Sequence, residues 1–313
     1  MITTVPTPTY TADNAVIYSQ ISTTRNASNS GLLAQSSALD TAAANHAGFL
    51  VTNNLANNYT YLGSSFGGTQ GGHYETTSYN SVSLSGFTGA TPGARAGFAG
   101  YTGTVIEEVS FGAASGAACL DSLLNSVYHL IQIMSSATQI GLSFNPGNSI
   151  DTVCVIELGT PSTTAGQLPA TSATTVYPFN GQTNVATAYA TASELPQVPV
   201  ASSFILTGQP VVINLYSLVN QTIAAGNLVI NSFTVTPGNT GVAVPATILT
   251  SAGVTVPANS SVVLTADPNL LQPGIVVLLP DAPLQGGAIV YSVAFNATVN
   301  GHSVAYSWNF TTR

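Results

Sequence analysis

The hydrophobic period of the sequence changes near Gly159, and this change limits the folds that the chain can adopt. Before Gly159, apolar residues recur at helical spacing in several stretches, with strand-like runs between them. After it, no helical periodicity persists, and short apolar runs are separated by Pro, Gly and Asn. The sequence therefore predicts an α+β protein with a mixed N-terminal part and an all-β C-terminal part.

Composition places the predicted domain boundaries. Residues 1–13 are a Thr- and Pro-rich extension, residues 14–160 form the first domain, and residues 161–176 are a linker rich in Gly, Thr, Pro, Ser and Ala. Residues 177–313 hold evenly spaced short strands with turn signals, which predicts an immunoglobulin-like (Ig-like) β-sandwich. Asn300-Gly301 is a type I′ hairpin signal inside it.

The first domain has recognisable helix and strand signals. Apolar spacing and capping residues predict four helices, and alternating or continuous apolar runs predict three strands. The expected helices are Asn14–Ser28, Ser37–Leu50 capped by Ser36 or Ser37, a short one that starts at Thr91-Pro92, and Ala117–Met134. The expected strands are Val105–Phe111, Ile140–Phe144 and Thr152–Leu158.

The chain is almost uncharged. Charged residues make up 4% of the 313 residues, there is no lysine, and the only cationic side chains that are always charged are Arg25, Arg95 and Arg313. This composition argues against nucleic acid and anionic membranes as partners. No apolar stretch is long enough for a transmembrane helix. The start of the chain lacks a signal-peptide pattern, so we expect a secreted or cell-surface protein whose signal peptide has been removed, or else a chain that is not secreted.

Titratable residues gather between Gly71 and Phe144, which holds two of the four histidines and three of the five glutamates. In a strand, Glu107 would share the more apolar face with Val105 and Val109, where a carboxylate is costly unless it is paired. Such a carboxylate is either part of an acid/base or metal site, or a satisfied structural group.

The histidines differ in their predicted surroundings. His129 falls opposite the apolar stripe of its expected helix, among small neighbours, which indicates the wall of a cleft. His73 and Glu75 are two residues apart, so they would point the same way in an extended segment. His46 lies on an apolar helical stripe and is expected to be a buried, hydrogen-bonded structural residue, whereas His302 is expected to be exposed.

Cys119 and Cys154 leave two interpretations open. A disulfide between them would tie a helix to a strand and would suit an oxidising compartment. The alternative is a pair of buried thiols that act as small hydrophobic residues.

Residues 14–158 resemble the CAP superfamily (cysteine-rich secretory proteins, antigen 5 and pathogenesis-related 1; SCP-like domains), in its bacterial extracellular branch. The resemblance rests on the order of several short motifs, each placed as in that family. They are Arg25, the helix Ser37–Leu50 with His46, His73 after a loop, Phe87–Pro92 with Arg95, Gly100-Tyr101, Glu107, His129 and Ile140-Gly141.

The resemblance implies an α-β-α sandwich with a cavity that holds two histidines and two acids. His73 and His129 would bind a divalent metal, with Zn²⁺ first and Ca²⁺ or Mg²⁺ as alternatives. Glu107 would be one acid and Glu75 the second, and either would be the candidate catalytic base. A small molecule or lipid would be another possible occupant of the cavity.

The sequence therefore predicts a secreted CAP-domain protein that binds a metal or small ligand. One alternative is a structural subunit of an extracellular surface layer or filament, whose N-terminal extension adds a strand to a neighbouring copy. Another is a weak metal-dependent hydrolase, although the sequence shows neither a nucleophilic triad nor an HExxH motif.

Overall fold

The computed structural model describes residues 1–66, 68–147, 151–168, 174–200, 206–215, 223 and 226–313. The chain is a mixed α+β protein, as predicted, and it forms two compact units. The first unit comprises residues 1–26, 31–124 and 132–167, and the second comprises residues 27–30, 125–131 and 168–313. The predicted linker includes residues 169–173, which lie outside the described residues.

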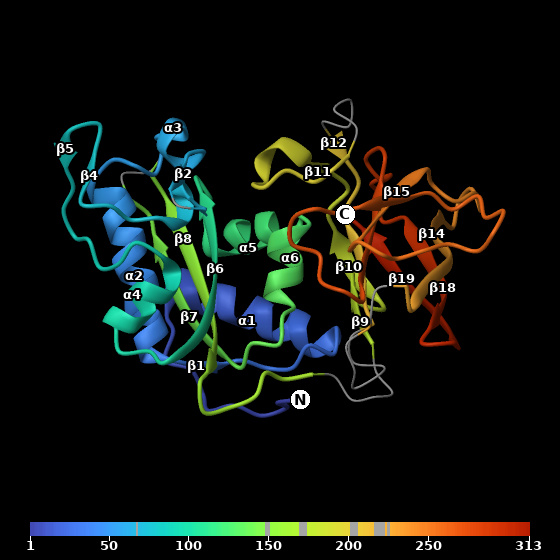
Figure 1. The fold of residues 1–313 in the computed structure, drawn as a ribbon, viewed down its shortest axis with the longest axis horizontal. Coiled ribbons are helices and arrows are strands. Elements are labelled where there is room, and N and C mark those ends of the chain that lie inside the picture. Colours follow the sequence, from blue (N-terminus) through green and yellow to red (C-terminus); the bar gives the residue numbers. More distant parts are fainter. Residues whose placement is uncertain (67, 148–150, 169–173, 201–205, 216–222, 224–225) are drawn as a thin grey trace. The chain divides into compact units, whose positions relative to one another are not determined.

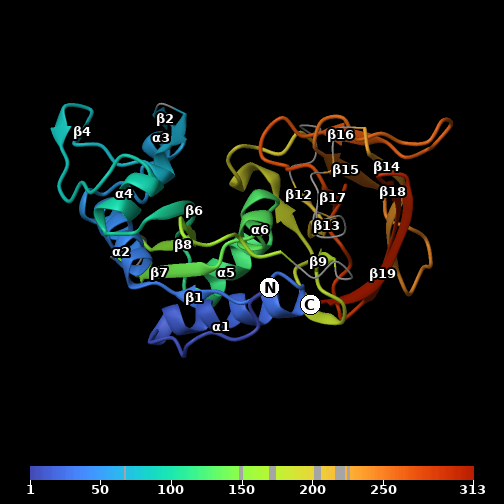
Figure 2. The ribbon, with the colours of Figure 1, turned by 60° about the horizontal axis from the view of Figure 1, so that its bottom comes forward.

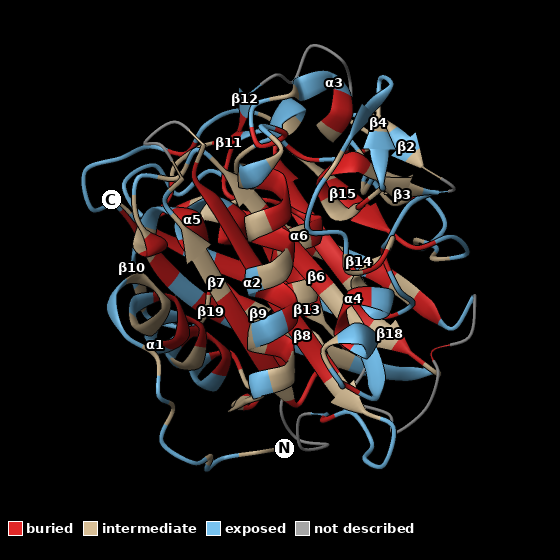
Figure 3. Ribbon diagram, turned by 90° about the vertical axis from the view of Figure 1, so that its left-hand side faces the viewer, coloured by how far each residue is buried: buried red, intermediate tan, exposed pale blue. Residues whose placement is uncertain are grey.

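The first unit is built on a four-stranded sheet with the order β1-β7-β8-β6. The strands are β1 (Ala34–Gln35), β6 (Gly103–Phe111), β7 (Gln139–Asn145) and β8 (Val153–Pro161). Strand β8 runs antiparallel to both neighbours, whereas β1 joins β7 in parallel. Seven consecutive residues of β8 are buried, as the red central strand in Figure 3 shows, because helices cover both faces of the sheet.

Helices α2 (Ser37–Thr52) and α4 (Pro92–Phe98) cover one face of this sheet (Figure 1). The side chain of Ser36 caps α2, and that of Thr91 caps α4 with Pro92 in the first turn, as the sequence indicates. Helix α2 lies very close to β7, because a Cβ added to Gly141 would come within 2.1 Å of the Leu39 backbone.

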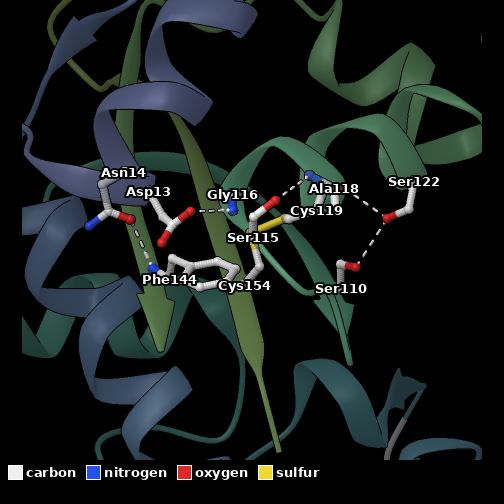
Figure 4. Close-up of a disulfide and its surroundings, with 10 residues drawn as sticks. All are labelled: Asp13, Asn14, Ser110, Ser115, Gly116, Ala118, Cys119, Ser122, Phe144 and Cys154. Carbon is white, nitrogen blue, oxygen red and sulfur yellow. Dashed lines mark hydrogen bonds between the residues drawn. A yellow bond between two sulfur atoms is a disulfide. The ribbon is translucent and has the colours of Figure 1, made fainter. Parts of the chain in front are cut away.

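Helix α5 (Gly116–Leu124) lies on the opposite face, where Cys119 forms a disulfide with Cys154 of β8 (Figure 4). Helix α1 (Ala12–Ala27) is held beside it. Asp13 accepts a hydrogen bond from the Gly116 N–H, and Asn14 accepts one from the Phe144 N–H. Disulfide and hydrogen bonds thus fix both helices to the sheet on the side away from α2.

The predicted helix Ala117–Met134 is wrong, because the structure breaks it into α5 and α6 (Tyr128–Ile133). The buried carboxylate of Glu194 accepts hydrogen bonds from the backbone N–H groups of Val127, Tyr128 and His129. A second helix can therefore start at this point, since its first N–H groups find a partner outside the helix.

The segment between α2 and α4 consists of short elements. They are α3 (Tyr59–Leu62), β2 (Ser65–Phe66), β3 (Thr69–Gln70), the 3-10 turn η1 (Gly71–His73), β4 (Ser78–Tyr79) and β5 (Val82–Ser83). Gly71 is required here, because a Cβ at this position would lie 1.7 Å from the Tyr61 carbonyl oxygen. This close approach fixes where η1 begins.

The N-terminal extension lies along its own unit. The Leu32 N–H donates to the Ile2 carbonyl, and the Thr9 N–H donates to the Gln35 side chain. Tyr10 donates to Asp40. The extension is therefore tied to the first unit by contacts that are internal to the chain.

The second unit contains two larger sheets, with the orders β10-β19-β18-β14 and β16-β15-β17-β13-β9. The first consists of β10 (Gln182–Val185), β14 (Leu228–Pro237), β18 (Val290–Val299) and β19 (His302–Thr312). The second consists of β9 (Thr175–Tyr177), β13 (Val211–Asn214), β15 (Ala246–Thr250), β16 (Leu264–Ala266) and β17 (Ile275–Pro280). A separate two-stranded pair consists of β11 (Tyr189–Ala190) and β12 (Leu206–Thr207). It follows β10 in the chain, and the 3-10 turn η2 (Thr191–Ser193) comes directly after β11.

One hydrophobic core joins residues of both larger sheets, among them Ile213, Val276, Phe295 and Phe310. Strands β18 and β19 form a long hairpin, visible side by side in Figure 2. Its turn has positive φ at Asn300 and Gly301, which is the predicted type I′ geometry. Trp308 is buried, and His302 is exposed, as expected for that histidine. Among the described residues, no helix has the length and apolar character needed to cross a bilayer.

Candidate functional site

His73 is the half-buried histidine of the first unit. It ends η1, and its side chain keeps 27% of its accessible surface. Its Nδ1 lies 3.0 Å from Oε1 of Glu107 on β6. A carboxylate only accepts hydrogen bonds, so Nδ1 carries the proton, and in the neutral ring Nε2 retains a lone pair. His73 therefore offers one nitrogen donor at a partly exposed position.

Glu107 orients His73 and is itself held by an arginine. Its Oε2 lies 2.6 Å from Nη2 of Arg95, which reaches it from α4. Burial alone would raise the pKa of Glu107, but the charge of Arg95, followed by the contributions of His46 and His73, brings this pKa well below its usual value. Glu107 lies on the face of β6 that carries Val105 and Val109, as predicted, and it is ionised.

Glu75 and His46 form a second, fully buried pair beside Glu107. Nδ1 of His46 lies 3.1 Å from Oε1 of Glu75, and Nε2 lies 2.9 Å from the Gly72 carbonyl oxygen. Glu75 also accepts a hydrogen bond of 2.7 Å from the Thr88 N–H. His46 is thus buried and hydrogen-bonded, as the sequence predicted, but its partners are the carboxylate and the turn next to His73.

Arg95 connects the two carboxylates. Its Nη1 donates to the His73 carbonyl at 3.1 Å, and its Nε lies 3.7 Å from Oε1 of Glu75. Burial would lower the pKa of Arg95, but the carboxylate of Glu107 more than offsets this effect and the net direction is upward. Arg95 is therefore a permanent cation inside the unit, although its side chain is fully buried.

Glu157 is a third carboxyl group on the same face of the sheet. The β6–β8 register places it directly opposite Glu107, and it is fully buried. Burial first, and the neighbouring carboxylate of Glu107 second, raise the pKa of Glu157 well above its usual value. Neither of its oxygens has a hydrogen bond of normal geometry to another described residue.

Sequence reasoning did not connect His46, Arg95 and Glu157 with this site. Glu157 had a visible signal, because it is the single acid within the apolar run Val153–Leu158. Arg95 had another, because it is one of only three basic residues of the Lys/Arg type and lies in a short capped helix. Both signals become meaningful only when the strand register and the helix position are known.

His129 belongs to the second unit, where its partner is Glu194. Oε1 of Glu194 lies 3.0 Å from Nδ1 of His129, and Ser126 Oγ lies 3.0 Å from the same nitrogen. A Ser-His-acid triad needs the hydroxyl at one ring nitrogen and the acid at the other, so these contacts do not form one. Burial alone would raise the pKa of Glu194. Hydrogen bonding to His129 is the first of several interactions that lower it, and the net direction is downward.

The predicted metal-binding pair of His73 and His129 stays a prediction, because the two residues belong to different units. Within the residues that the structure describes, no group of three or more His, Cys, Asp or Glu side chains is arranged to hold a metal. The oxygens of Glu75 and Glu107 already have hydrogen-bond partners among histidine, arginine and backbone groups. The donor set of the first unit therefore fits a single nitrogen ligand at His73 and not a closed cage of protein ligands.

No protein-family model and no curated protein matches the sequence. Among solved structures, the chain is similar to PcoC, a methionine-rich copper resistance protein from Escherichia coli, with 14% identity and a TM-score of 0.25, over 44% of this chain and 93% of PcoC. The selenomethionine form of PcoC gives 14% identity and a TM-score of 0.24, over 44% of this chain and 95% of that one. At these TM-scores neither a shared fold nor a shared function follows.

Proposed function

We propose that the first unit binds a divalent metal ion or a small ligand through Nε2 of His73. The observation that carries this proposal is the contact between His73 Nδ1 and the ionised Glu107, which fixes the ring and leaves Nε2 at the partly exposed side chain. A histidine that donates its other N–H to a carboxylate is the usual arrangement of metal-bound imidazole, because the carboxylate orients the ring and raises its basicity.

Zn²⁺ is the ion that suits this donor best. Imidazole nitrogen is a favoured ligand of zinc, whereas Ca²⁺ and Mg²⁺ prefer several oxygen ligands. The nearby carboxylates of Glu75 and Glu107 are buried and engaged, so they offer little to an oxygen-seeking ion. Further ligands would come from water or from the bound molecule.

We also propose that the first unit is a CAP-like domain and the second an Ig-like β-sandwich, in a secreted or cell-surface protein. The order of the elements, with helices on both faces of one sheet, supports the first assignment. Two sheets that share one core support the second. The disulfide between Cys119 and Cys154 favours an oxidising compartment.

Calorimetric titration with Zn²⁺ tests the binding proposal. The wild type is compared with His73→Ala and with His302→Ala, a control that removes an exposed histidine from the β18–β19 turn. We expect His73→Ala to abolish the binding, because it removes the proposed ligand itself, and loss of an outer-shell partner alone costs about 10–100-fold in metal affinity. His302→Ala should leave the affinity unchanged. Equal affinities for wild type and His73→Ala would reject the proposal.

A further inference from the structure

The first attachment point of the N-terminal segment (residues 1–10) is built around Gln167. This buried amide accepts the Ile2 N–H at 2.9 Å and donates to the carbonyl of Leu32, whose own N–H donates to the Ile2 carbonyl. Gly31 leaves room for the contact, because a Cβ there would lie 2.0 Å from Gln167 Oε1. Both backbone polar groups of Ile2 are thus satisfied by groups of the first unit.

The second attachment point lies at the other end of the segment. The Thr9 N–H donates to Gln35 Oε1 at 2.7 Å, and the Tyr10 hydroxyl donates to Asp40 Oδ1 at 2.7 Å. Between the two points, none of residues 3–8 forms a hydrogen bond with another described residue, and most of them are exposed. The segment is therefore held by two separate sets of contacts, and any copy of the first unit offers both.

The sequence of the segment suits docking as an extended chain. Pro6 and Pro8 fix their own φ angles and favour extended conformations in the residues before them. An undocked segment therefore has fewer conformations to lose when it docks. Residues 1–12 carry no charged side chain, so the segment brings no additional like charge to a second copy of this acidic chain.

The junction between the segment and α1 is strained. Ala12 has a φ of +48°, in the left-handed region that is unfavourable for an alanine because of its Cβ. This bend lies where the segment leaves α1 and turns onto its own unit. A change of backbone angles at Ala12 would release the strain and direct the segment away from its own copy. Strained junctions of this kind favour exchange of an element between copies.

We propose that the N-terminal segment exchanges between two copies of the chain, with Ala12 as the hinge. Each segment then makes the contacts described above on the other copy, so no attachment is lost and the strain at Ala12 is released in both chains. Reciprocal exchange closes the assembly as a dimer, because each copy donates one segment and accepts one. The exchange is independent of the function proposed for His73, and it gives a mechanism to the self-assembly considered from the sequence.

Variants of Ala12 test the hinge. Glycine adopts positive φ without strain, so Ala12→Gly stabilises the monomer and should lower the dimer-to-monomer ratio by at least about tenfold. A β-branched residue is more strained than alanine at positive φ, so Ala12→Val should raise this ratio by a similar factor. Light scattering after size-exclusion chromatography measures the three proteins at matched concentrations, and circular dichroism checks that each is folded.

Cysteine cross-linking tests which surfaces meet. Thr9 Oγ1 lies 3.2 Å from Gln35 Oε1, and both native cysteines are already in a disulfide. Thr9→Cys and Gln35→Cys are made in separate chains, mixed, incubated and oxidised. We expect a covalent dimer with a bond between positions 9 and 35, identified by mass spectrometry of its peptides. Thr9→Cys mixed with His302→Cys, whose new thiol is exposed on β19, is the control and should give no such dimer.

Two results would overturn the proposal. One is a protein that remains monomeric both as wild type and as Ala12→Val at the highest soluble concentration. The other is a dimer that shows no bond between positions 9 and 35 in the mixture, although the double variant Thr9→Cys/Gln35→Cys forms that bond within one chain. Such a dimer would use another surface. Cross-linked dimers together with opposite shifts for Ala12→Gly and Ala12→Val would support the exchange.

Discussion

Glu107 and Glu157 lie directly opposite each other on β6 and β8, yet they hold their protons differently. Arg95 and two histidines lower the pKa of Glu107 well below its usual value, whereas burial and the charge of Glu107 raise the pKa of Glu157 well above it. Two adjacent buried carboxylates would repel each other strongly, so one proton on the pair is the arrangement that a dry interior allows. The single arginine within reach selects which of the two is charged.

Replacing Glu157 by Gln should stabilise the protein at pH 8 and change little at pH 4. The raised pKa in the folded state means that Glu157 favours folding below its unfolded pKa of about 4.3, and that this contribution is lost as pH rises through the folded value. Gln keeps the neutral shape and has no proton to lose. Thermal melting at both pH values measures the effect. The control is Asp121→Asn, which removes an exposed carboxylate from α5. A Glu157→Gln variant that loses stability equally at both pH values would contradict this prediction.

Replacing Arg95 by Ala should destabilise the first unit by about 3–5 kcal/mol, the usual loss when one partner of a buried ion pair is removed. Glu107 would remain buried without its main cation, and Glu75 would lose a neighbouring charge. Arg95→Lys keeps the charge but cannot contact both groups in the same way, so an intermediate loss is expected. Urea denaturation measures all three proteins. If Arg95→Ala unfolds at the wild-type midpoint, the cluster contributes little to stability.

Replacing Gly141 by Ala should separate α2 from β7 and so disturb the site. The new methyl group would strike the backbone of Leu39 and Asp40, which cannot move without shifting the helix that carries His46. A loss of about 1–3 kcal/mol is expected from overpacking. Gly97→Ala is the matched control, because a Cβ there meets nothing within 4 Å inside α4, and helix propensity predicts a gain of about 0.5–1 kcal/mol. Opposite signs for the two variants in thermal melts would support this packing, and equal effects would contradict it.

The features that the sequence predicted correctly depend on neighbouring residues. The caps at Ser36 and Thr91, the turn at Asn300, and the side of the strand that Glu107 occupies all follow from local preference or alternation. Features set by distant residues were missed. The break after α5 depends on Glu194, more than 60 residues away along the chain, and the pairing of Glu107 with Glu157 depends on strand register.

Replacing Glu194 by Ala should destabilise the second unit, because three backbone N–H groups at the start of α6 lose their acceptor. Each buried unsatisfied donor costs about 1–3 kcal/mol, and water would recover part of this. Glu194→Gln keeps an acceptor oxygen and should lose less. The pKa of Glu194 is lowered in the folded state, so its contribution is present above the unfolded value of about 4.3 and is lost as pH falls through the folded value. Melting curves at pH 7 and pH 3 should therefore differ less for Glu194→Gln than for the wild type.

Reduction of the disulfide should destabilise the first unit without abolishing its fold. Cys119 and Cys154 are 35 residues apart, and closing a loop of this length removes enough freedom from the unfolded chain to stabilise the native state by about 3–4 kcal/mol. For a unit of this size, that corresponds to a fall of roughly 10 °C in Tm on adding a reductant. Differential scanning calorimetry with and without the reductant measures it, and the double variant Cys119→Ala/Cys154→Ala is the control, since its Tm should not respond. The hydrogen bonds of Asp13 and Asn14 still hold α1 after reduction, so the unit should remain folded at 25 °C. A wild-type Tm that is unchanged by reductant, with both thiols shown to be free, would mean that the bond does not constrain the unfolded chain in this way.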